Sequence, residues 1–185
     1  MRAVFLCSAA FALMGMAPTG AAVISVGGNS AKSCYNAAAA RDASANAMHD
    51  CNIALGQDVL PYTDLVASYV NRGVLRLIQA DYRSAESDFD QAMALQPTQA
   101  EAWLNKGIAR YQQGDTKSAV ENFDRAIQLR TRYAALAYFG RGLANEDNGD
   151  IKAAYADLKH ASQLNPQWDA PRQELARFQV RKHSG

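Results

Sequence analysis

The sequence predicts an all-α protein built as a solenoid of helical hairpins. Three observations carry this prediction: a pattern of small and bulky residues recurs about every 34 residues, alanine is frequent, and apolar positions follow helical spacing. The best copy of the pattern lies between Ala100 and Tyr133. A repeat of this length made of helical hairpins is typical of a solenoid, in which each unit stacks on the next.

The repeated pattern places small residues where two helices must touch. In the stretch 100–133, Gly107 and Ala119 are small at that contact, Phe123 packs into it, and Gly114–Asp115 breaks the chain between the helices. The preceding copy of the pattern comprises Tyr69, Gly73, Ala85, Phe89 and Ala92, and the following copy comprises Gly142, Gly149, Asp150, Ala154, Leu158 and Ala161.

The amino-acid composition argues against one class of function, nucleic-acid binding. The apolar fraction of 49% is ample for a core, and 20% of the residues are charged, which is a normal solvated surface. Lys and Arg number 19 against 18 Asp and Glu, so the chain lacks the strongly basic character of most nucleic-acid binders. We therefore expect no nucleic-acid partner.

The N-terminus has the pattern of a secretory signal peptide. Arg2 is followed by an apolar run to Met16, and small residues end the segment at Ala22. The run is too short for a membrane-spanning helix, which needs about 20 residues. We expect cleavage after Ala22 or Ala21 and no stable membrane insertion afterwards; the alternative is a buried N-terminal helix.

Loss of the signal peptide would remove Cys7 and leave a pair, Cys34 and Cys51. Because an exported protein meets an oxidising compartment, this pair predicts a disulfide. Metal binding is the alternative, but two cysteines without a histidine array make a poor zinc site. We expect no metal and no cofactor.

The chain divides into segments along this pattern. A capping helix is expected at the C-terminus because Asp169 and Pro171 suit a helix start. The predicted segments are a signal peptide at 1–22, a flexible leader at 23–29, a degenerate cysteine-stapled hairpin with its linker at 30–65, full repeats at 66–99, 100–134 and 135–168, and the capping helix at 169–182.

The spacing of these small, aromatic and proline residues resembles the tetratricopeptide repeat. The resemblance implies a right-handed α-solenoid, and the layout from signal peptide to basic end is similar to small exported proteins of this class from Gram-negative bacteria, which are periplasmic; secretion is the alternative. It also implies binding of a peptide or protein on a concave groove lined by the first helix of each hairpin. The implied groove residues are Val70, Val74, Leu77, Leu104, Ile108, Tyr111, Phe139 and Leu143.

Polar and charged residues also lie near the implied groove. Asn105 fits one place of the carboxylate clamp found in chaperone-binding repeats, but Val70 and Val74 replace its polar partners, which argues against a clamp. One cation recurs in each hairpin, at Arg72, Lys106 and Arg141. We expect these cations to form ion pairs with acids of neighbouring helices, such as Asp88, Asp90 or Asp124, rather than to bind a ligand.

No group of residues has the spacing of a catalytic site. The three histidines, His49, His160 and His183, are far apart, and the glycines suit helix contacts and turns rather than a phosphate-binding loop. The sequence therefore predicts a non-enzymatic scaffold whose partner is a protein or peptide. The alternative is a structural or assembly protein whose groove is filled by its own leader or by weak self-association.

Overall fold

The computed structural model describes residues 22–24 and 28–178. The predicted signal peptide, except Ala22, lies outside these residues, as do positions 25–27 of the predicted leader and positions 179–182 of the predicted capping helix. None of the helices within the described ranges is both long enough and apolar enough to span a bilayer.

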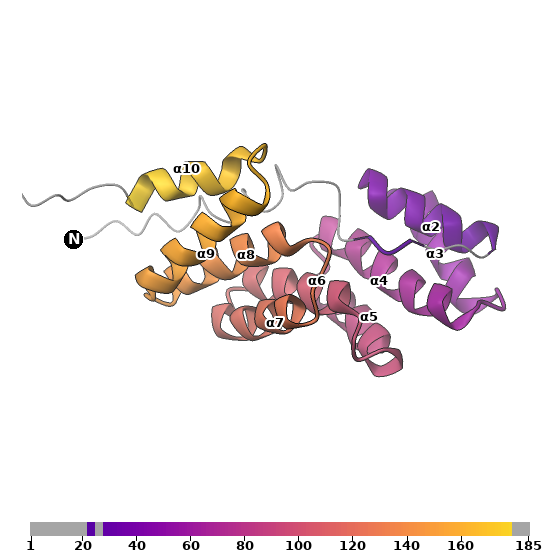
Figure 1. Ribbon diagram of the computed structural model, residues 1–185. Helices are drawn as coiled ribbons and strands as arrows, with labels where there is room; N and C mark the ends of the chain where they lie inside the picture. Colours follow the sequence, from indigo (N-terminus) through magenta and orange to yellow (C-terminus); the bar gives the residue numbers. More distant parts are fainter. Residues whose placement is uncertain (1–21, 25–27, 179–185) are drawn as a thin grey trace, which may run out of the picture.

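The described residues form nine helices and no strands (Figure 1). The helices are α2 (Asn29–Ala40), α3 (Ala45–Gly56), α4 (Tyr62–Ile78), α5 (Tyr82–Leu95), α6 (Ala100–Gln112), α7 (Thr116–Gln128), α8 (Ala134–Asp147), α9 (Ile151–Leu164) and α10 (Asp169–Phe178). Consecutive helices pack in pairs, and each pair packs against the next, so the chain is a helical solenoid as predicted.

The first helices of the three full repeats form one layer. Helix α6 contacts both α4 and α8, whereas α5, α7 and α9 make their main contacts with the first helices beside them. The closer spacing of α4, α6 and α8 makes their layer the inner side of the curved array. This layer is the one predicted to line a groove.

The turns inside the three full repeats share one design. The helix ends at a residue with left-handed backbone, which is Ala80, Gly114 or Gly149, and an aspartate follows at once. Each aspartate caps the next helix by accepting a hydrogen bond from a backbone N–H three residues on, at 3.2 Å for Asp81 and 3.3 Å for Asp115. Hydrogen bonds from Ser84 lower the pKa of the Asp81 carboxyl, which keeps the cap ionised at neutral pH.

The helices of each repeat approach closely because a glycine faces a bulky side chain. A Cβ added at Gly107 would lie 2.8 Å from Phe123 Cδ1, and one added at Gly73 would lie 2.4 Å from Phe89 Cε1. Gly142 has the same relation to Leu158 in the third repeat. The predicted contact between small and bulky positions is therefore confirmed in all three repeats.

A second glycine brings adjacent repeats together. A Cβ added at Gly140 in α8 would lie 2.5 Å from Cζ of Phe123, the ring that also packs on Gly107. The Phe123 ring thus fills the space between its own repeat and the following one, and it is fully buried. The spacing within one repeat does not predict this role of Gly140, because the contact is made between repeats.

The first hairpin is closed by the predicted disulfide between Cys34 and Cys51, at a sequence separation of 17. Both cysteines are fully buried, and they pack with Val74 and Leu75 of α4. Closing a loop of this length stabilises the folded chain by about 3 kcal/mol through the entropy of the unfolded state. The disulfide joins α2 to α3, and it lies in the cluster that packs this alanine-rich hairpin against α4.

One boundary differs from the prediction, at the start of α4. Residues 62–65, placed in a linker, belong to α4, because Pro61 stands at the position just before the helix and its carbonyl accepts from Leu65 N–H at 3.0 Å. At the other end, α10 starts at Asp169 as expected, and Trp168 before it packs on Phe139 with ring centroids 4.8 Å apart. Leu175 and Phe178 of α10 pack against the core of the last repeats.

We predict that Gly107→Ala lowers the free energy of unfolding by about 1–3 kcal/mol, because the new methyl group would overlap the Phe123 ring. Gly56→Ala is the matched control, since no atom lies within 4 Å of its added Cβ, and it should stabilise α3 by up to about 1 kcal/mol. Urea unfolding measures both changes. Equal stabilisation by the two substitutions would contradict the proposed contact.

Candidate functional site

The candidate site is the inner face formed by α4, α6 and α8, because all predicted groove residues lie on these three helices. Helix α4 carries Val70, Val74 and Leu77; α6 carries Leu104, Ile108 and Tyr111; α8 carries Phe139 and Leu143. The structure brings Leu104, Tyr111, Phe139 and Leu143 into one cluster, Val70 and Leu77 into a second, and Val74 into a third beside the disulfide. Ile108 packs against the first two clusters.

The predicted groove residues are mostly buried within the fold. Seven of the eight have exposed fractions of 9% or less, and Ile108 is half-buried. Their first role is therefore to pack the inner layer, and their role as contacts to a partner stays a prediction. Polar side chains beside them hold a short segment of the chain, Ala22–Val23, on this face.

The segment Ala22–Val23 lies against α4, where Figure 1 draws it as a short indigo trace. Val23 N–H donates to Oδ1 of Asn71 at 2.8 Å, and Nδ2 of Asn71 donates to the Val23 carbonyl at 2.9 Å. One fully buried amide thus satisfies both polar backbone groups of one residue. Because both bonds go to backbone atoms, they hold the chain without reading its side chain.

The residue before Val23 is held by the loop between α7 and α8. The Ala22 carbonyl accepts from the Tyr133 hydroxyl at 3.3 Å and from Nη2 of Arg132 at 3.5 Å. Burial raises the pKa of the Tyr133 hydroxyl, so this group stays protonated and able to donate. The segment is therefore held on one side by α4 and on the other by the loop that precedes α8.

A buried carboxylate fixes the loop that carries these donors. Glu101 of α6 accepts from Thr131 Oγ1 at 3.3 Å and from Arg132 N–H at 3.4 Å. It also forms an ion pair with Nε of Arg132 at 3.5 Å. Helix α6 in this way positions the two donors, Arg132 and Tyr133, that the loop between α7 and α8 presents to Ala22.

Sequence reasoning missed Asn71, Arg132 and Tyr133. Asn71 lies at the position of the first full repeat that corresponds to Asn105 in the second, and both are buried. Comparing Asn105 with its counterpart one repeat earlier would have identified Asn71. No repeat pattern marks Arg132 or Tyr133, because they belong to the loop at which the repeat spacing changes.

The recurring cations form the ion pairs that were predicted. Arg72 pairs with Asp88 at 2.7 Å, Lys106 pairs with Asp90 at 2.5 Å, and Arg141 pairs with Asp157 at 2.6 Å and also with Asp124. Asp88, only 2% exposed, accepts from Arg76 as well, at 2.8 Å. Two of these pairs, Arg72–Asp88 and Arg141–Asp157, join the two helices of one repeat. The other two, Lys106–Asp90 and Arg141–Asp124, join adjacent repeats, so these cations are engaged within the fold.

An acidic group lies at the C-terminal end of the inner face. Glu146 pairs with Arg177 of α10 at 2.9 Å, and Arg177 also pairs with Glu174. Burial raises the pKa of Glu146, while Arg177 acts against this shift. Burial and a hydrogen bond with Asp147 raise the pKa of Tyr111, which keeps its hydroxyl protonated. The cluster thus ties α10 to the last repeat.

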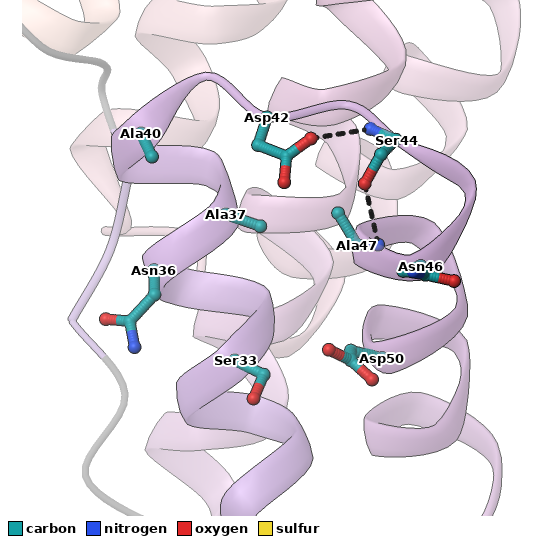
Figure 2. A pocket seen from close by; sticks show the side chains of 9 residues that line it. All are labelled: Ser33, Asn36, Ala37, Ala40, Asp42, Ser44, Asn46, Ala47 and Asp50. Carbon is teal, nitrogen blue, oxygen red and sulfur yellow. Dashed lines mark hydrogen bonds between the residues drawn. The ribbon is translucent and has the colours of Figure 1, made fainter.

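A polar hollow lies on the first hairpin, between α2 and α3 and beside the turn that joins them (Figure 2). It has a volume of about 400 Å³ and is lined by Ser33, Asn36, Ala37, Ala40, Asp42, Ser44, Asn46, Ala47 and Asp50. Its hydrogen bonds are those of a helix start: Ser44 Oγ accepts from Ala47 N–H at 3.3 Å, and Asp42 accepts from Ser44 N–H at 3.0 Å. Nowhere in the described ranges do three or more metal-ligating side chains gather.

The chain belongs to the tetratricopeptide repeat family. The family matches at residues 70–134 and 106–167, two overlapping stretches that together run from the middle of α4 to just past the end of α9. No curated protein matches the sequence. Tetratricopeptide repeats generally serve as non-enzymatic scaffolds that bind proteins or peptides.

We predict that Asp88→Asn destabilises the fold more than Asp90→Asn. Removing the Asp88 charge leaves Arg72 and Arg76 without their shared partner, which we expect to cost about 2 kcal/mol after allowing for the partial exposure of both arginines. Asp90 is 52% exposed, so the loss of its pair with Lys106 should cost less than about 1 kcal/mol. Urea unfolding of both variants tests this order, and equal costs would contradict it.

Proposed function

We propose that the protein is a non-enzymatic interaction scaffold that binds an extended peptide or protein segment along the inner face of α4, α6 and α8. The supporting observation is the paired hydrogen bonding between Asn71 and the backbone of Val23. In this contact one side chain of α4 bonds both polar backbone groups of a residue, which supports binding of a segment whose backbone groups are free. Extended segments are a common ligand of repeat scaffolds because their backbone N–H and C=O groups are free to form hydrogen bonds with the scaffold.

The same proposal includes the place of action. We propose export through the predicted signal peptide to the periplasm, as in small tetratricopeptide proteins of Gram-negative bacteria. The disulfide between Cys34 and Cys51 supports this proposal, because such bonds persist in oxidising compartments.

The experiment is a selection from a displayed library of random peptides, carried out on the whole chain and on Asn71→Leu. Leucine keeps the volume of Asn71 but can make neither hydrogen bond, so enrichment should fall at least about tenfold, in line with the loss of two buried hydrogen bonds. Asn46→Ala, on the exposed surface of the first hairpin, is the control and should select as the original chain does.

Circular dichroism and thermal unfolding verify that the variants remain folded. No enrichment on any of the proteins would refute peptide binding. Equal enrichment on the original chain and on Asn71→Leu would move the site away from the inner face.

A further inference from the structure

The segment Ala22–Val23 occupies part of the face that we assign to an external peptide. We propose that this segment is a built-in competitor for the site, and that it defines what the site accepts: an extended chain with a small residue followed by a branched aliphatic residue. The inference rests on the proposed function, with the signal peptide cleaved after Ala21 so that Ala22 stays in the mature chain, and it narrows the class of partner.

The backbone contacts set the first requirement. Asn71 uses both ends of its amide on Val23, and Tyr133 and Arg132 both donate to the Ala22 carbonyl. A ligand must therefore present a free N–H and C=O at the Val23 position and a free carbonyl just before it. A helical segment cannot meet this requirement because its backbone groups are bonded internally, and proline at the Val23 position lacks the N–H.

The side-chain contacts set the second requirement. Ala22 is only 3% exposed and packs in the cluster that contains Val74, Leu75 and the disulfide, so a larger side chain has no room there. Val23 packs against the neighbouring cluster around Val66 and Val70. Ile24, by contrast, is 55% exposed, so the position after Val23 should accept many residues.

The tether explains why this segment would compete well. Only a few residues separate Val23 from Asn29, where α2 begins, and α2 packs directly on α4. A segment on so short a tether acts at an effective concentration on the order of millimolar. An external ligand then binds with an apparent affinity reduced by the fraction of chains in which the site is open.

The test uses a labelled peptide with the local sequence AAVISVGG and three forms of the whole chain: the original, Val23→Asp and Ile24→Asp. Val23→Asp places a charge in an apolar cluster and should release the segment, whereas Ile24→Asp makes the same change at an exposed position. We expect the peptide to bind Val23→Asp at least about tenfold more tightly than the other two, as removal of an intramolecular competitor requires.

Variants of the peptide test its sequence class on the Val23→Asp chain. A tryptophan in place of the alanine before valine should weaken binding at least about tenfold, because the Ala22 site is closed to large side chains. Serine in place of isoleucine should leave binding unchanged, because Ile24 is exposed.

Each other outcome overturns a stated part of the inference. Equal affinity for all three chains would show that the segment does not compete, although peptide binding itself would stand. Failure of this peptide on every chain, while the library still yields Asn71-dependent binders, would refute the sequence class alone. A dimer of the original chain that Val23→Asp dissociates would show that the segment binds a second copy rather than its own chain.

Discussion

The packing of Phe123 between two glycines is the contact on which the array depends most. Its ring lies against Gly107 of its own repeat and Gly140 of the following one, at distances that leave no room for a methyl group at either position. Burial of this ring stabilises the fold by about 1.5–3 kcal/mol. It also sets how closely α6 and α8 approach, since two glycines must face the same side chain. The corresponding contacts of Phe89 on Gly73 and Leu158 on Gly142 maintain the pattern in the flanking repeats.

The ordered inner layer that results determines what can bind there. Ion pairs such as Arg72–Asp88 and Arg141–Asp157 hold the first and second helices of a repeat together. Their charges are therefore not available to bind a ligand. The apolar residues of the inner layer are likewise buried against one another, so they leave little surface for a ligand. The groups left to recognise a ligand are buried polar side chains that bond its backbone, above all the Asn71 amide. Recognition by such groups favours the extended conformation of a ligand and leaves sequence preference to the few side chains that pack beside them.

Most of the fold could be predicted from the sequence, because the repeat pattern specifies which small and bulky residues pack together. Gly107 with Phe123, Asp115 at a turn and Arg141 beside acids follow from residue size, backbone freedom and charge at fixed spacing. The site was less predictable, because it depends on contacts between residues that do not recur with the repeat spacing. Tyr133 and Arg132 lie in a loop, and their common partner Ala22 is about 110 residues away along the chain. The double role of Phe123 was missed for a similar reason, since Gly140 belongs to the next repeat.

Hydrogen exchange at the Val23 amide tests the central claim most directly, because this N–H donates to the buried oxygen of Asn71. The account predicts slow exchange in the free protein, exchange near the rate of an unstructured chain in Asn71→Leu, and the same fast exchange when saturating peptide displaces the segment. Fast exchange at Val23 in the free, original protein would contradict the account, because the inner face would then not hold an extended chain through Asn71.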